Sequence, residues 1–120
     1  MSRRRVLVVD DDETIGELLE ATLLDAGYDV AVAAGGAAAL ELAERFKPHL
    51  VLLDLRMPGI DGRGFVEAYR RSAGRRAPIA VVTAVRDAAA AANALGAQGV
   101  LEKPFELAEL LNLVARLARG

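Results

Sequence analysis

Short runs of apolar residues alternate with longer amphipathic stretches along the whole chain. The short runs are rich in valine, leucine and isoleucine, and they lie at residues 6–9, 30–32, 50–53, 79–82 and 100–101. Each run is continuously apolar rather than alternating with polar residues, which is typical of strands in a parallel sheet that helices cover on both faces. The pattern therefore predicts five buried parallel strands.

Amphipathic helices are predicted between these strands. After the first strand, apolar residues recur with helical spacing at Ile15, Leu18, Leu19 and Leu23. The last stretch repeats this spacing with Leu107, Leu110, Leu111, Val114 and Ala118, and both stripes are expected to face the core. Gly27 and Gly74 are interpreted as helix ends. Strands that alternate with helices in this way predict an open, doubly wound α/β sheet.

Composition narrows the class of protein. Apolar residues make up 53% of the 120 residues and charged residues 27%, a balance that suits one globular domain. The net charge is −2 and the main basic cluster is Arg3–Arg5, so direct binding to nucleic acid is not expected. The chain contains no cysteine, and no apolar run approaches the roughly 20 residues of a membrane span. A cytoplasmic protein that does not bind membranes is predicted.

Polar residues stand where the predicted strands end. Asp10 and Asp11 follow the first strand, Asp54 the third, Thr83 the fourth, and Lys103 comes shortly after the fifth. The carboxyl ends of parallel strands share one edge of a sheet, and ligands bind there in folds of this class. These five side chains are therefore expected to lie close together.

Three carboxylates that converge require a counter-ion. At an effective dielectric constant of about 20 they repel one another by roughly 3–4 kcal/mol per pair, which a single lysine offsets only in part. Oxygen ligands without cysteine or a nearby histidine favour Mg²⁺, or Mn²⁺. Asp12 is assigned instead to the cap of the following helix. His49 is expected at the surface, about 16 Å from Asp54 at the rise of a strand.

Four segments at these strand ends have a familiar form: residues 6–11, 52–62, 81–84 and 103–105. Together, in this order and at this spacing, they resemble the receiver domains of two-component response regulators, of the chemotaxis-receiver type. The resemblance extends over the whole chain. It implies a flavodoxin-like (βα)₅ fold with strand order 2-1-3-4-5. It also implies a single receiver domain over residues 1–120, with no effector domain within this sequence.

The resemblance also implies a role for each residue of the predicted site. Asp54 would be the phosphoacceptor, and its phosphoryl donor would be the phosphohistidine of a sensor histidine kinase or of a histidine phosphotransfer protein. Mg²⁺ would be held by Asp54, by Asp11 directly, by Asp10 mainly through water, and by the backbone carbonyl of Arg56. Thr83 and Lys103 would bind phosphoryl oxygens. Pro104 would follow a cis peptide bond. The fourth helix, fifth strand and fifth helix would form the switched face, which binds an output partner or a second copy of the chain.

Two departures from the family pattern affect signalling. Val100 stands where the family usually has Tyr or Phe, so the ring that normally swings inward behind the switching hydroxyl is missing. Either the signal would depend on backbone shifts from Thr83 through Ala84 to residue 86, with a smaller rotation of Val100, or the output would be muted. Arg56 and Val85 stand where the hydrolytic water approaches, and a bulky cation and an apolar side chain there predict slow self-dephosphorylation.

Two alternative functions remain. Asp10 to Thr14 also match D-x-D-x-T, the opening motif of haloacid-dehalogenase-type phosphatases, in which Asp10 would be the nucleophile and Asp12 the acid/base. That alternative leaves Asp54 without a role. The other is a scaffold that keeps the receiver fold and binds partners without being phosphorylated.

Overall fold

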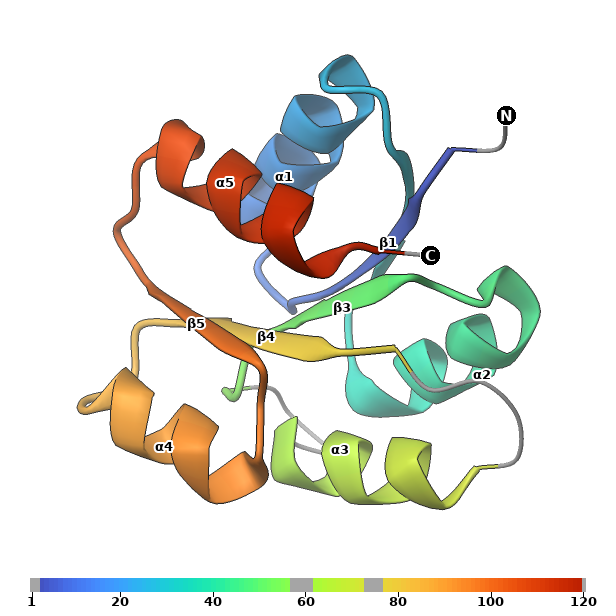
Figure 1. The fold of residues 1–120 in the computed structure, drawn as a ribbon. Coiled ribbons are helices and arrows are strands. Elements are labelled where there is room, and N and C mark those ends of the chain that lie inside the picture. Colours follow the sequence, from blue (N-terminus) through green and yellow to red (C-terminus); the bar gives the residue numbers. More distant parts are fainter. Residues whose placement is uncertain (1–2, 57–61, 73–76, 120) are drawn as a thin grey trace.

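The computed structural model describes residues 3–56, 62–72 and 77–119, in which strands and helices alternate from end to end (Figure 1). The strands are β1 (Arg5–Val9), β2 (Asp29–Ala33), β3 (Leu50–Leu53), β4 (Ile79–Thr83) and β5 (Gly99–Glu102). The helices are α1 (Glu13–Asp25), α2 (Gly36–Phe46), α3 (Gly62–Arg71), α4 (Ala88–Leu95) and α5 (Leu107–Leu117). Each predicted strand is present, longer by at most two residues, and residues 50–53 match without change.

All strands are parallel and form one sheet with the order β2-β1-β3-β4-β5. The predicted doubly wound fold and its strand order are thus confirmed. β1 lies between β2 and β3, and its Val8 pairs with Val32 of β2 on one side and with Leu52 of β3 on the other. All strands therefore end at the same edge of the sheet, which we call the carboxyl edge.

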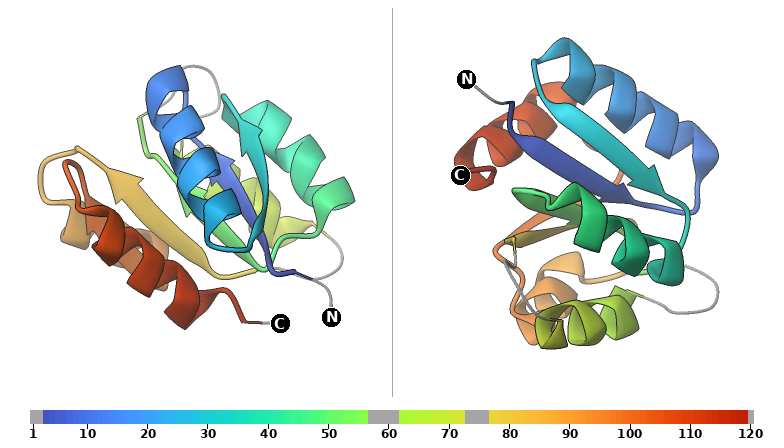
Figure 2. Two further views of the ribbon diagram at one scale, coloured as in Figure 1. Left: turned by 90° about the horizontal axis from the view of Figure 1, so that it is seen from above. Right: turned by 90° about the vertical axis from the view of Figure 1, so that its right-hand side faces the viewer.

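Helices cover both faces of the sheet (Figures 1 and 2). α1 and α5 lie on one face, and α2, α3 and α4 lie on the other. Successive residues of a strand point to opposite faces, so in β1 Val6 and Val8 belong to the core under α1 and α5, whereas Leu7 and Val9 belong to the core under α2 and α3. Burial on both faces explains why the strand sequences are continuously apolar.

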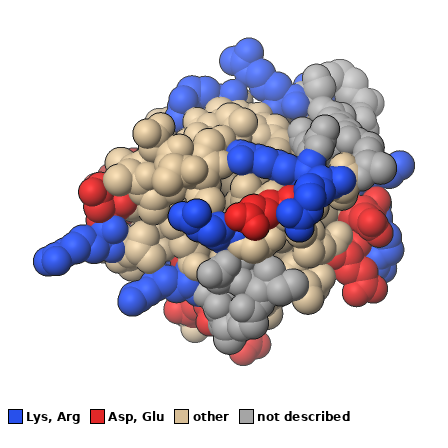
Figure 3. Space-filling model, turned by 90° about the horizontal axis from the view of Figure 1, so that it is seen from below, with Lys and Arg blue, Asp and Glu red and all other residues tan. Residues whose placement is uncertain are grey.

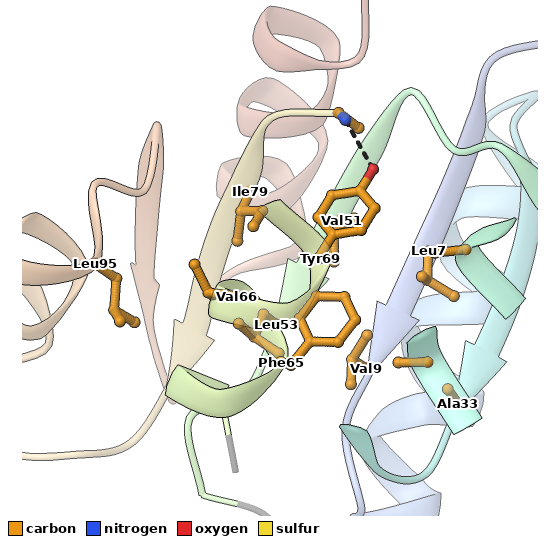
Figure 4. Close-up of a cluster of buried hydrophobic side chains, with 13 residues drawn as sticks. Leu7, Val9, Ala33, Val51, Leu53, Phe65, Val66, Tyr69, Ile79 and Leu95 are labelled. Carbon is orange, nitrogen blue, oxygen red and sulfur yellow. Dashed lines mark hydrogen bonds between the residues drawn. The ribbon is translucent and has the colours of Figure 1, made fainter. Parts of the chain in front are cut away.

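Two aromatic residues anchor α3 to the sheet (Figure 4). Phe65 is 0% exposed and Tyr69 4% exposed, and their rings stack with centroids 5.5 Å apart. The Tyr69 hydroxyl also accepts a hydrogen bond from the backbone N–H of Ala77, at 2.8 Å. The two rings therefore pack in the core and tie α3 to the start of β4.

Helix ends follow the predicted signals where they can be compared. Asp12 is the N-cap of α1, since its Oδ1 accepts a hydrogen bond from the backbone N–H of Ile15 at 3.2 Å. Gly27 lies just beyond α1 with a φ of 99°, in the region that favours glycine. The helix end predicted at Gly74 lies outside the described residues. No helix of the described ranges has the length and the apolar character needed to cross a membrane.

Two members of the predicted apolar stripes are exposed to solvent, and for these the prediction was wrong. Leu18 and Leu107 are each 43% exposed. Leu18 is adjacent to Leu19, and consecutive helical residues point about 100° apart, so only Leu19 faces the sheet. Leu107 is the first residue of α5, whose buried residues begin at Leu110.

His49 was predicted at the surface and is instead 6% exposed. Its Nδ1 accepts a hydrogen bond from the backbone N–H of Arg5 at 2.9 Å, and its own backbone N–H donates to the Arg5 carbonyl at 2.7 Å. His49 precedes β3 at the edge opposite the carboxyl edge. The imidazole is buried because it provides the acceptor for a backbone amide at the start of β1.

Candidate metal centre

The predicted site residues lie together at the carboxyl edge, as expected. Backbone hydrogen bonds continue one residue past the strand ends and place them. The N–H of Asp10 donates to Ala33 O at 3.0 Å, that of Asp54 to Val9 O at 2.9 Å, and that of Lys103 to Thr83 O at 2.9 Å. Each side chain is thus positioned by the sheet itself rather than by a flexible loop.

Asp54 is at the centre of the site and is 7% exposed. Its Oδ1 accepts hydrogen bonds from the hydroxyl of Thr83 at 2.9 Å and from the backbone N–H of Arg56 at 3.2 Å. Its Oδ2 lies 3.3 Å from the ammonium of Lys103. The carboxylate is therefore held from two sides by a hydroxyl and a cation.

Asp10 and Asp11 complete a cluster of carboxylates with Asp54, and the three residues offer ligand oxygens within 4.8 Å of one another. Asp10 is 4% exposed, whereas Asp11 is exposed. The Oδ1 of Asp10 accepts the backbone N–H of Asp12 at 2.9 Å, and its Oδ2 lies 2.7 Å from Lys103 Nζ. A single ammonium is thus shared between two buried carboxylates.

The protonation equilibria reflect this imbalance of charge. Burial raises the pKa of Asp10, and the hydrogen bond from Lys103 offsets that effect only in part. For Lys103 burial acts to lower the pKa, but the attraction of Asp10 and Asp54 outweighs it, so this pKa is raised. The two directions are consistent, because the lysine has two anionic partners while Asp10 shares its lysine with Asp54. The cluster is short of positive charge.

This donor set fits a hard divalent cation. Carboxylate oxygens are the ligands that Mg²⁺ and Mn²⁺ prefer, and the exposed Asp11 leaves the cluster accessible from solvent. An open hollow of about 380 Å³ lies beside Asp10 and Asp11 and continues along Glu13 and Glu17 of α1. The hollow gives water access to the cluster at Asp10 and Asp11. The backbone carbonyl of Arg56 as a further ligand stays a prediction.

The remaining predicted residues surround the site. Val85 is half-buried and its backbone N–H lies 3.4 Å from the Thr83 hydroxyl, while Ala84 and Arg56 are exposed. Val100 is 36% exposed on β5. The Lys103–Pro104 peptide bond is cis, as predicted.

The sequence-based interpretation missed the contribution of the backbone. The N–H groups of Asp12 and Arg56 donate to the buried carboxylates, and side-chain identity does not reveal such donors. Gly62 was not predicted to take part in the site, yet a Cβ on it would lie 2.8 Å from the Cα of Leu55 and 3.2 Å from the carbonyl oxygen of Asp54. A glycine at the first residue of α3 is the one signal in the sequence for this close approach.

Comparison with known proteins agrees with this geometry. The family model of the response regulator receiver domain matches residues 6–115. The DNA-binding response regulator MtrA of Mycobacterium tuberculosis is 40% identical over 121 residues, which cover 98% of this chain and 52% of MtrA. A probable transcriptional regulator, ycf27 of Porphyridium aerugineum, is 39% identical over 92% of this chain and 46% of its own length. The chain thus spans about half the length of the curated relatives it matches.

Solved structures show the same fold. The chemotaxis response regulator CheY4 of Vibrio cholerae superposes with a TM-score of 0.87 at 34% identity, covering 97% of this chain and 99% of CheY4. The response regulator TrrA of Thermotoga maritima, solved in complex with Mg²⁺ and a beryllofluoride, has a TM-score of 0.84 at 33% identity, covering 95% of this chain and 98% of TrrA. By its sequence, its fold and the arrangement of its acidic edge, the chain belongs to the family of response regulator receiver domains.

Proposed function

We propose that this chain is a Mg²⁺-dependent phosphoacceptor that is phosphorylated on Asp54. The observation that supports this best is the setting of the Asp54 carboxylate, which lies between the Thr83 hydroxyl and the Lys103 ammonium and beside two further carboxylates. Phosphoryl transfer requires positioning and neutralisation of charge more than covalent help from the protein. The site offers both.

In the proposed reaction, a carboxylate oxygen of Asp54 attacks the phosphorus of a phosphohistidine. The donor is a sensor histidine kinase or a histidine phosphotransfer protein, and the departing imidazole keeps the electron pair of the broken P–N bond. Bound Mg²⁺ (or Mn²⁺), held by Asp10, Asp11 and Asp54, supplies the positive charge that the cluster lacks. Lys103 lies 3.3 Å from Asp54 and can bind a phosphoryl oxygen once the carboxylate becomes an acyl phosphate.

Phosphorylation of Asp54 would change the contacts of Thr83. Thr83 is 0% exposed. Its hydroxyl donates a hydrogen bond to Asp54 Oδ1 and accepts one from the backbone N–H of Val85 at 3.4 Å. A phosphoryl group brings several strong acceptor oxygens. If the hydroxyl turns to one of them, the hydrogen bond of Val85 changes and the segment before α4 is displaced. This route does not need an aromatic ring at Val100.

The proposed output surface is the face formed by α4, β5 and α5, through which the chain would bind a partner or a second copy of itself. MtrA is a DNA-binding response regulator, and this chain matches about half of it. We place any DNA binding by a protein that contains this chain outside residues 1–120, which we assign to a single receiver domain.

We also propose slow self-dephosphorylation. Arg56 lies two residues after Asp54 and is exposed, and Val85 lies two residues after Thr83 and is half-buried. The double variant Arg56→Asn, Val85→Glu replaces a bulky cation and an apolar side chain by polar groups that can orient water. Its acyl phosphate should have a shorter half-life than that of the wild type, and an unchanged half-life contradicts the proposal.

The phosphatase alternative has less support from the geometry. Asp12 would be its acid/base, but Asp12 caps α1, and Asp10 pairs with Lys103 at 2.7 Å. Asp54 would have no role, although three groups of the chain bind it. The scaffold alternative differs from the proposal only in the absence of phosphate incorporation.

One experiment separates the three functions. The protein is incubated with acetyl phosphate, with Mg²⁺ or with a chelator, and the modified residue is mapped by mass spectrometry. The proposal requires Mg²⁺-dependent modification of Asp54 that Asp54→Asn abolishes. Asp10→Asn should weaken Mg²⁺ binding, so that more Mg²⁺ is needed, and should leave the modified residue unchanged. The exposed Asp25→Asn is the matched control. Modification of Asp10 would support the phosphatase, and no incorporation in the wild type would support the scaffold.

A further inference from the structure

The C-terminal end of α4 is tied to α3 by one arginine. The guanidinium of Arg70, in the last turn of α3, donates from Nη1 to the carbonyl of Leu95 at 2.6 Å and from Nη2 to the carbonyl of Gly96 at 3.0 Å. The last carbonyls of a helix lack partners within it and carry the negative end of its dipole. The two charge-assisted hydrogen bonds from Arg70 to these carbonyls therefore hold the end of α4 strongly against α3.

Other features strengthen the same end. Gly96 ends α4 with a φ of 68°, and a Cβ there would lie 3.4 Å from both terminal nitrogens of Arg70. The side chain of Leu95 is 8% exposed and belongs to the same apolar core as Val66 and Tyr69 of α3. The C-terminal end of α4 is thus held by packing and by charge.

The N-terminal end of α4 is held much less. Its buried residues in the first turns are Ala88 and Ala92, which have little side chain to pack. Its cap is Asp87, whose Oδ1 lies 3.4 Å from the N–H of Ala90, at the long limit of a hydrogen bond. A hollow of about 180 Å³ lies between α3 and α4 and is lined by Leu55, Arg63, Ala91 and Leu95.

α3 itself is a firm support for the tie. Its first residue, Gly62, lies against the backbone of Leu55 directly after the phosphoacceptor, and Phe65 and Tyr69 are buried under the sheet. Figure 3 shows the side of the molecule on which α3 and α4 lie, where basic side chains gather around an acidic one. Arg63, Arg70 and Arg71 of α3 are all exposed, and Arg70 is the one whose guanidinium donates to the two carbonyls at the end of α4.

We propose that Arg70 is the positioning residue for α4: it fixes the C-terminal end of the helix to α3, and phosphorylation of Asp54 moves the N-terminal end about this point. The inference rests on the proposed function, because it takes the displacement to start at Thr83 and Val85. It assigns the change at the output face to residues 87–91 and leaves residues 93–97 in place. Movement of α4 about its fixed C-terminal end would also change the output face without an aromatic ring at residue 100.

The test is hydrogen exchange of the backbone amides of the full chain, with and without Mg²⁺ and beryllofluoride. Arg70→Ala is compared with Arg71→Ala, which removes the same charge from the neighbouring exposed position. In the unmodified protein, Arg70→Ala should speed exchange of residues 93–97 roughly tenfold, the equivalent of one net charge-assisted hydrogen bond, and Arg71→Ala less than about twofold. In the wild type, beryllofluoride should alter exchange at residues 88–91 and leave residues 93–97 unchanged, whereas in Arg70→Ala it should alter both.

Equal exchange in the two variants overturns the proposal, and so does a beryllofluoride effect in the wild type that is centred on residues 93–97. Arg70→Lys keeps the charge but cannot donate to both carbonyls in the same geometry, so it should give an intermediate effect. It also replaces Arg70→Ala if the latter does not fold. If the wild type binds no beryllofluoride and incorporates no phosphate, the proposed function fails, while the comparison of variants in the unmodified protein still decides whether Arg70 anchors α4.

Discussion

Replacing Lys103 by methionine tests the electrostatic account of the site most directly. Methionine keeps an unbranched side chain but removes the ammonium that lies 2.7 Å from Asp10 and 3.3 Å from Asp54. At an effective dielectric constant of about 20 these contacts correspond to attractions of roughly 6 and 5 kcal/mol, most of which offsets the cost of burying the charges.

The expected net loss is smaller than these attractions. Removing one partner of a buried ion pair costs about 3–5 kcal/mol, because a charge is left without compensation. The Lys103 side chain is 16% exposed, and water can reach the cluster from the side of Asp11. Because water screens the cluster, we expect Lys103→Met to lower the free energy of unfolding by about 2–3 kcal/mol at pH 7.5 without divalent cations, at or just below the lower limit of that range.

Acid should reduce this loss. Burial already raises the pKa of Asp10 in the wild type, so the folded state binds a proton at Asp10 more readily than the unfolded state. The stabilisation that results is present at low pH and is lost as the pH rises through the pKa of Asp10 in the folded state. Without Lys103 the pKa of Asp10 should rise further. The difference in the free energy of unfolding between Lys103→Met and the wild type should thus become smaller as the pH falls from 7.5 towards about 5. Adding Mg²⁺ at pH 7.5 should make this difference smaller as well.

Urea unfolding, followed by circular dichroism at several pH values with and without Mg²⁺, measures the effect. Arg71→Met is the matched control, since it removes an exposed cation away from the cluster. A loss in Lys103→Met no larger than that in Arg71→Met at pH 7.5 would refute the charge balance described here, as would a difference that widens on acidification.

Three further changes follow from single contacts. Gly62→Ala places a Cβ 2.8 Å from the Cα of Leu55, and because backbone must move to relieve it, the free energy of unfolding should fall by about 1–3 kcal/mol, with Gly35→Ala, where a Cβ meets nothing within 4 Å, as the control. His49→Phe keeps a ring but leaves the Arg5 N–H without its acceptor, and urea unfolding should show a loss of about 1–3 kcal/mol. Mg²⁺ should raise the melting temperature of the wild type measured by calorimetry, and Asp11→Asn should remove most of that rise while having little effect on the metal-free protein; an equal rise in both would contradict the role of Asp11.

Prediction from the sequence succeeded where a local pattern has one physical solution. Continuous apolar runs such as residues 50–53 fit a strand that is covered on both faces and fit poorly elsewhere. Prediction failed where two adjacent apolar residues of a helix could equally well face the sheet. Leu18 and Leu19 are equally apolar, but only Leu19 faces the sheet, and the rotation of α1 that decides this depends on packing with the strands and with α5. His49 failed for a related reason, because its acceptor role depends on the amide of Arg5, which is distant in sequence.

The amino-acid sequence by itself determined the alternation of strands and helices, and it placed Asp10, Asp11, Asp54, Thr83 and Lys103 at strand ends that a parallel sheet must gather on one edge. Only the tertiary structure decided which atoms meet there: that Lys103 lies nearer to Asp10 than to Asp54, and that backbone amides complete the bonding of both carboxylates. It also decided that Arg70 of α3 donates to carbonyls at the C-terminal end of α4. The physical reason is one of range. Periodicity and strand ends are properties of neighbouring residues, whereas a hydrogen bond between residues far apart in the chain depends on side-chain positions that are defined only once all the helices have packed.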